Sequence, residues 1–193
     1  MPMRRNVLNL SLVYEIILFA TACFFSIRPV EDYDFWFHLK YGEYIATIKM
    51  LPFTDLFSHT AYGRDAVPYE WLFQLVLYVI HNTLGNIGVQ TMVVLFVLVY
   101  LFLFRQILKE IFHLKPIVRI AFIAGLFTIN FYYWEERPQL WAYLLFMAIL
   151  YLVLKRVYLN KNWLWITIPL FFIWTNVHAS MILGLYLFFG FGT

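Results

Sequence analysis

The chain has 193 residues, of which 63% are hydrophobic and only 13% are charged, whereas soluble domains carry about 25% charged residues. This composition excludes an ordinary soluble domain, and a net charge of +3 is too small to indicate a nucleic-acid partner. The single cysteine, Cys23, excludes a disulfide within the chain and a cysteine-based metal site.

Six apolar runs follow one another along the chain, and several approach the roughly 20 residues that cross about 30 Å of hydrocarbon. They are Val7–Ser26, Val89–Phe104, Ile117–Trp134, Leu140–Leu154, Trp163–Trp174 and Met181–Phe191. We therefore predict an all-α integral membrane protein with about six transmembrane helices in a single domain, residues 1–193. No polar tail follows the last run, so we expect the chain to be the N-terminal part of a larger fold.

The segment Arg28–Glu70 is a long connection in a chain whose other connections are short, so it is expected to carry structure and function of its own. Within it, the spacing of apolar residues predicts an amphipathic helix over Phe35–Met50. Asp34 occupies the position of the residue that caps the start of this helix. Leu51–Asp65 has the composition of a series of turns.

A second helix is predicted to begin near Pro68 and Glu70 and to stop or break at Gly85. Its first part is too short to span a bilayer. Glu70, Gln74, Tyr78 and His81 recur there at helical spacing on an otherwise apolar segment. Such a polar stripe is typical of a helix that lies flat on a membrane or lines a cavity.

The distribution of charge predicts the orientation of the chain, because cytoplasmic connections are enriched in Lys and Arg. With the N-terminus in the cytoplasm, the inner segments hold nine basic residues and one acidic residue, Glu110. The outer segments then hold nine of the 11 acidic residues and five basic ones. Arg28–Glu70 is therefore predicted to be the first outer loop. Glu15 lies within the first apolar run, and we assign it no catalytic role.

Several spaced motifs in and after this loop carry a resemblance to a known family. They are Asp32-x-Asp34-x-Trp36-x-His38-Leu39-x-x-Gly42, Pro52-x-x-Asp55-x-Phe57-Ser58, Pro68-x-Glu70-Trp71-Leu72, Arg137-Pro138-Gln139-Leu140 and Trp174-Thr175-Asn176-Val177-His178-Ala179. The chain thus resembles polytopic bacterial membrane proteins related to the C-type (GT-C fold) glycosyltransferases, over most of its length. The resemblance implies a polyprenyl-phosphate-linked sugar as donor and an acidic residue of the first outer loop as catalytic base. It also implies a bacterial inner membrane with the active face outside.

The reaction implied needs a base for the acceptor hydroxyl and positive charge for the leaving phosphate. Asp34 is the first candidate for the base and Asp32 the second. Arg137 is the best candidate for binding phosphate, because a guanidinium can contact two phosphate oxygens at once. The further candidates for substrate binding are His38, Asp55, Glu70, Asn176 and His178. Asp32, Asp34 and His38 are also plausible ligands for a divalent cation, although their spacing is not diagnostic.

Each of these residues also has a purely structural interpretation. Asp34 and Glu70 suit helix starts, Asp55 suits a turn, and Arg137 can pair with Glu135 or Glu136. Asn176 and His178 can hydrogen-bond between helices. Two other functions stay open at this point: a transporter or flippase of a lipid-linked or polar substrate, and a non-catalytic membrane assembly subunit. A transporter is expected to carry polar groups near the bilayer midplane, often in repeated halves, and neither feature is visible in the sequence.

Overall fold

The computed structural model describes residues 3–30 and 32–191, with side chains from residue 10 onward. The helices are α1 (Met3–Ser26), α2 (Tyr33–Ile48), α3 (Trp71–Gln106), α4 (Pro116–Asn130), α5 (Pro138–Leu159), α6 (Thr167–Thr175) and α7 (Met181–Phe191). A π-helical turn, Ile107–Ile111, extends α3, and two short 3-10 turns, Phe131–Tyr133 and Leu164–Ile166, precede α5 and α6. Residues 192–193, which bear on the expectation of a longer chain, lie outside this description.

Three helical segments of the described chain are long and apolar enough to cross a bilayer: Trp71–Ile111, Pro116–Tyr133 and Pro138–Leu159. The all-helical fold and the membrane composition therefore agree with the prediction. The count of six spans is not established, because Leu164–Thr175 and Met181–Phe191 are apolar but shorter, and the side chains of α1 are described only over Leu10–Ser26.

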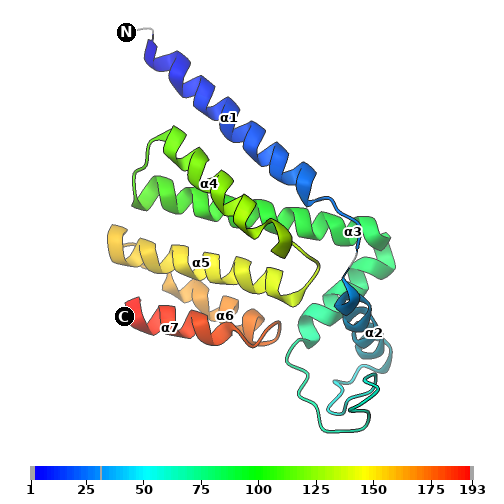
Figure 1. The fold of residues 1–193 in the computed structure, drawn as a ribbon. Helices are drawn as coiled ribbons and strands as arrows, with labels where there is room; N and C mark the ends of the chain where they lie inside the picture. The colour runs from blue at the N-terminus through cyan, green and yellow to red at the C-terminus, as the bar shows by residue number, and fades with distance from the viewer. Residues whose placement is uncertain (1–2, 31, 192–193) are drawn as a thin grey trace.

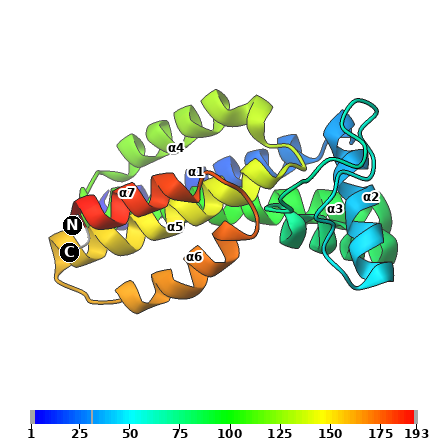
Figure 2. The ribbon, with the colours of Figure 1, turned by 90° about the horizontal axis from the view of Figure 1, so that it is seen from below.

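The second part of α3 and α5 lie side by side at the centre of a helical bundle (Figure 1). α1 and α4 pack on the side of α3, and α6 and α7 pack on the side of α5 (Figure 2). Large apolar side chains fill the centre, among them Val97, Leu101, Ile123, Trp134 and Leu140. One end of the bundle lies next to α2, and the other lies next to the start of α4 (Figure 1).

Gly85 divides α3 into two parts that point in different directions (Figure 1). Its backbone angles, φ 61° and ψ −156°, lie in a region that glycine enters freely because it has no Cβ. The first part packs against α2, and the second part enters the bundle. The break predicted at Gly85 is thereby confirmed.

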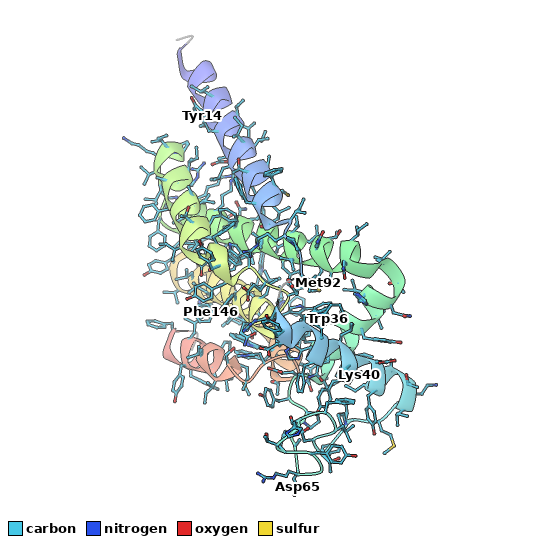
Figure 3. The ribbon with its side chains drawn as sticks, turned by 45° about the vertical axis from the view of Figure 1, so that its right-hand side comes forward. Tyr14, Trp36, Lys40, Asp65, Met92 and Phe146 are labelled. Carbon is cyan, nitrogen blue, oxygen red and sulfur yellow. The ribbon has the colours of Figure 1, made fainter. Side chains whose placement is uncertain are left out.

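α2 and the 49–70 loop form a compact layer across one end of the bundle (Figures 1 and 3). Phe35 of α2 packs with Phe73 and Leu77 of α3 in a fully buried cluster. Gly42 lies so close to α3 that a Cβ on it would stand 2.0 Å from the carbonyl oxygen of Gln74. Asp65 lies at the far tip of the loop, away from the bundle (Figure 3).

The opposite end of the bundle is held by a buried ionic cluster. The Glu15 carboxylate of α1 accepts hydrogen bonds from Arg105 Nη2 at 2.6 Å and from Arg119 Nη2 at 2.8 Å. Only 7% of the Glu15 side chain is exposed. Three helices are thus tied together at the end where the basic residues gather, and Glu15 is ion-paired there.

Candidate functional site

The start of α2 is built by Asp32, whose side chain accepts a hydrogen bond from the backbone N–H of Asp34 at 3.2 Å. Asp32 is therefore the capping residue, and the prediction that Asp34 caps this helix is wrong. The helix begins two residues earlier than expected, at Tyr33. Asp34 lies instead in the first turn, where the helix dipole favours a negative charge, and 62% of its side chain is exposed.

Arg137 joins the start of α2 to the start of α5. Its Nε and Nη2 donate to the two carboxylate oxygens of Asp32 at 2.8 Å and 2.5 Å. The same guanidinium lies 3.2 Å from Glu135 and, through Nη1, 3.6 Å from Asp34 Oδ2. The bond to Asp32 is the main reason why the pKa of Arg137 is raised. Two of the predicted site residues, Asp32 and Arg137, are thus joined in a forked ion pair, with Asp34 at its edge.

This ion pair borders a cavity of about 300 Å³ between the end of α1 and the segment that precedes α5. Arg28 also lines the cavity and donates to the carbonyl oxygens of Trp134 at 2.6 Å and Phe131 at 3.1 Å. Gln90 of α3 donates to the carbonyl oxygen of Arg28 at 2.9 Å. The cavity, here called the α1–α5 cavity, therefore has polar walls drawn from three distant parts of the chain.

Glu136 is a cavity residue that sequence reasoning missed. Only 9% of it is exposed, and it makes no ion pair with any described residue. Burial raises the pKa of its carboxyl, and the nearby carboxylates of Asp32 and Glu135 act in the same direction. In the sequence, the charged run Glu135-Glu136-Arg137 before Pro138 indicates a polar site at this helix start. Nothing in the run tells which of its side chains is buried.

His38 and Glu70 face each other between α2 and the start of α3. His38 Nδ1 lies 3.8 Å from Glu70 Oε2 and 3.4 Å from Gln74 Nε2. Burial lowers the pKa of His38 to about 4, against the opposing effect of Asp34 and Asp32. Burial, together with the charge of Asp34, raises the pKa of Glu70 to about 7. His38 is therefore neutral at physiological pH, whereas the pKa of the Glu70 carboxyl lies close to that pH.

Asp55 is held in a turn, where its carboxylate accepts from the backbone N–H groups of Phe57 at 3.1 Å and Ser58 at 2.8 Å. A hydrogen bond with the Ser58 side chain is the main reason why the pKa of Asp55 is lowered, and the backbone bonds from Ser58 and Phe57 act in the same direction. Asp55 also lines a cleft of about 150 Å³ with Glu70, between α2 and the loop.

Asn176 and His178 lie between α6 and α7, outside the α1–α5 cavity. Asn176 Oδ1 accepts from Trp71 Nε1 at 2.7 Å, and its backbone carbonyl accepts from Leu72 at 3.1 Å. It thus fixes the start of α3 to the end of α6. His178 Nδ1 accepts from the backbone N–H of Ser180 at 3.1 Å, and the residue lines a separate cavity of about 300 Å³.

The set Asp32, Asp34 and His38 is not assembled as a metal site. Asp32 is engaged by Arg137, and His38 turns toward Glu70 and Gln74. Across residues 3–30 and 32–191, no group of three or more His, Cys, Asp or Glu side chains is arranged to hold a metal ion.

Comparison with protein-family models, with curated proteins and with solved structures finds no match to this chain.

Proposed function

We propose that the chain is a membrane glycosyltransferase, or the N-terminal part of one, that moves a sugar from a polyprenyl-phosphate-linked donor to an acceptor hydroxyl on the non-cytoplasmic face. The observation that carries this proposal is the exposed carboxylate of Asp34, which lies beside Arg137. Asp32 in turn holds Arg137 in place at the wall of a polar cavity. The cavity lies where apolar helices end, which is where a lipid carrier presents its head group.

In the proposed reaction a bond forms between the acceptor oxygen and the sugar C1 as the bond from C1 to the phosphate oxygen breaks. The acceptor proton passes to Asp34, which is the more accessible of the two aspartates. The electron pair leaves with the polyprenyl phosphate. Arg137 and Arg28 both line the cavity, and guanidinium groups stabilise the charge that develops on a phosphate.

Asp32 is assigned a positioning role rather than that of the base. Its two oxygens both accept from Arg137, and only 3% of its side chain is exposed. Asp32 therefore holds Arg137 in place and starts α2, which presents Asp34.

The arrangement of polar groups favours surface chemistry over translocation. The charged side chains of the described chain gather at the two ends of the bundle: Asp32, Asp34 and Arg137 at one, and Glu15, Arg105 and Arg119 at the other. A transporter is expected to place its binding groups near the bilayer midplane.

The test is the Asp34→Asn variant of the full-length protein in membranes, assayed with a panel of polyprenyl-phosphate-linked hexoses and pentoses. Labelled sugar transfer and release of polyprenyl phosphate are measured together. We expect loss of about 10²- to 10⁴-fold, because the amide cannot accept the acceptor proton. The matched control is Asp65→Asn, at the exposed tip of the loop, which should retain full transfer.

Full transfer by Asp34→Asn would remove Asp34 as the base. No transfer by the wild-type protein with any donor in the panel would overturn the proposed function itself.

A further inference from the structure

A second cleft, separate from the α1–α5 cavity, lies between α2 and the 49–70 loop and is lined by both Asp55 and Glu70; it is here called the α2–loop cleft. None of the described residues that line it is a Lys, Arg or His. It shares no lining residue with the α1–α5 cavity. An inference about the α2–loop cleft therefore does not depend on the proposed sugar transfer.

The carboxylate of Glu70 has no hydrogen-bond partner among the described residues, although only 16% of its side chain is exposed. His38 Nδ1 lies 3.8 Å from it, which is too far for a hydrogen bond. Burial lowers the pKa of His38 to about 4, so this imidazole brings no positive charge at neutral pH. A mostly buried carboxylate is costly unless a donor pairs with it.

Gln74 presents a second unsatisfied group to the α2–loop cleft. The residue is 6% exposed and lines the cleft, and its Nε2 lies 3.4 Å from His38 Nδ1. Its Oε1 makes no hydrogen bond to any described residue and keeps accessible surface. Buried polar groups are nearly always hydrogen-bonded. A carboxylate and an amide oxygen that both lack a donor therefore indicate a donor from outside the chain.

The hydroxyl groups of the cleft report a negative potential. The charge of Glu70 is the main reason why the pKa of Tyr69 is raised. Burial raises the pKa of Tyr41, and the charge of Asp55 acts in the same direction. The pKa of Glu70 itself is raised by burial and by the charge of Asp34. Because every one of these charges is negative, the cleft favours a cation over water or a neutral molecule.

The size of the cleft restricts that cation to a small one. Its volume is about 150 Å³, well below the roughly 300–1,000 Å³ of sites that hold whole small molecules. The aromatic residues Phe37, Tyr41 and Tyr69 form part of its walls, and aromatic rings attract ammonium groups. A metal ion suits the cleft less well, because no group of three or more His, Cys, Asp or Glu is arranged to hold one in the described chain.

We infer that the α2–loop cleft binds a primary ammonium group, whose charge pairs with Glu70 and one of whose N–H groups donates to the amide oxygen of Gln74. An ammonium group on a short carbon chain has the required charge, size and N–H donors. The ethanolamine head group of a membrane phospholipid presents such a group, and so does a small soluble amine.

The experiment titrates ethanolamine onto the full-length protein in phosphatidylcholine nanodiscs and measures binding by ligand-observed NMR, with empty nanodiscs as the blank. It is carried out at pH 8, above the raised pKa of Glu70 of about 7. Ethylene glycol, in which a hydroxyl replaces the ammonium, is the matched ligand. We expect ethanolamine to bind and ethylene glycol to bind at least about tenfold more weakly, because a hydrogen bond to a charged group is the stronger kind.

Phosphatidylethanolamine in the nanodiscs distinguishes the two sources of the ammonium group. Displacement of free ethanolamine by this lipid would identify the phospholipid head group as the occupant. Undiminished binding of ethanolamine in its presence would identify a soluble amine.

Glu70→Gln should weaken ethanolamine binding at least about tenfold, because it removes the charge at nearly the same shape, and Gln74→Leu should weaken it by about fivefold. The matched control is Glu43→Gln. Glu43 is exposed, pairs with Lys40 at 2.7 Å and does not line the cleft, so this variant should bind as the wild type does. Thermal unfolding identifies any variant that fails to fold, and the two cleft variants then substitute for each other.

Three results would overturn the inference. They are a wild-type protein that does not bind ethanolamine, ethylene glycol that binds as tightly as ethanolamine, and folded cleft variants that bind ethanolamine as the wild type does. The second result would show that the cleft is hydrated and does not select for charge. Sugar transfer, present or absent, changes none of these outcomes, because the two sites are separate.

Discussion

Asp32 and Asp34 are two residues apart in the sequence, yet the structure places them in opposite environments. Asp32 caps the start of α2 and faces Arg137, and only 3% of its side chain is exposed. The side chain of Asp34 is 62% exposed. The cause is the start of the helix between them, which turns successive side chains in different directions. The two carboxylates therefore suit different tasks, one to hold the arginine and the other to take a proton.

Glu70 gives a prediction on the pH dependence of stability. Its pKa is raised from 4.5 to about 7 by burial and by the charge of Asp34. Because the folded state favours the protonated form, the stabilisation is complete below pH 4.5 and is lost as the pH rises through about 7. One pKa unit corresponds to about 1.4 kcal/mol, so the loss should be on the order of 3 kcal/mol. Glu70→Gln should remove this loss and leave only the opposite change that His38 causes, as measured by chemical unfolding at pH 5 and pH 8.

His38 acts in the opposite direction over an overlapping range of pH. Its pKa is lowered from 6.5 to about 4, so the stability that it contributes is complete above pH 6.5 and is lost as the pH falls through about 4. The control for Glu70 is Glu43→Gln, on the exposed side of α2, which should leave the difference between pH 5 and pH 8 as in the wild type. An unchanged difference in Glu70→Gln would show that Glu70 is not buried as described.

At the scale of elements, the site depends on how α2 sits on the first part of α3. Phe35, Phe73 and Leu77 bury the contact, and Gly42 allows the two backbones to approach closely. Gly85 then turns the chain from this layer into the bundle. A change at either glycine acts on the site at a distance, through the position of α2.

Gly42→Ala should separate α2 from α3, because the added Cβ would lie 2.0 Å from Gln74 O and 2.7 Å from Tyr78 Cβ. Overpacking of this kind costs about 1–3 kcal/mol, so we expect a lower melting temperature and weaker transfer. Gly125→Ala in α4 is the matched control, since nothing lies within 4 Å of its added Cβ. Alanine there should stabilise the helix by roughly 0.5–1 kcal/mol. Equal melting temperatures for the two variants would contradict the close approach at Gly42.

The whole molecule separates its charges between the two ends of the bundle. The predicted acidic candidates Asp32, Asp34, Asp55 and Glu70 all lie at the α2 end, while Arg105 and Arg119 lie at the other. Such an asymmetry orients a chain in a membrane, because basic segments stay in the cytoplasm. The expected topology therefore has the α2 end outside the cell.

Cysteine labelling tests this orientation in a Cys23→Ser background. A cysteine at Thr60, in the 49–70 loop, should react with a membrane-impermeant thiol reagent in intact cells. A cysteine at Asn162, at the opposite end, should react only after lysis; both positions are exposed. The reverse pattern would place the cavity in the cytoplasm and remove the proposed donor from its reach.

The sequence by itself determined the features that depend on neighbouring residues. Apolar periodicity predicted α2 to within two residues at each end, and glycine chemistry predicted the break at Gly85. Runs of apolar residues predicted an all-helical membrane chain, and three of the described helical segments are long enough to span; the count of about six spans stays a prediction. All of these follow from local backbone preference and from burial in lipid.

Only the tertiary structure decided which polar groups meet. Arg137 and Asp32 are 105 positions apart, and Ser26, at the end of α1, lines the same cavity as Trp134, which precedes α5. Motif spacing cannot reveal such contacts, because they depend on how helices pack and cross rather than on the period of any one helix. For the same reason Glu136 and Glu135 are equivalent in the sequence, and packing alone buries one and exposes the other.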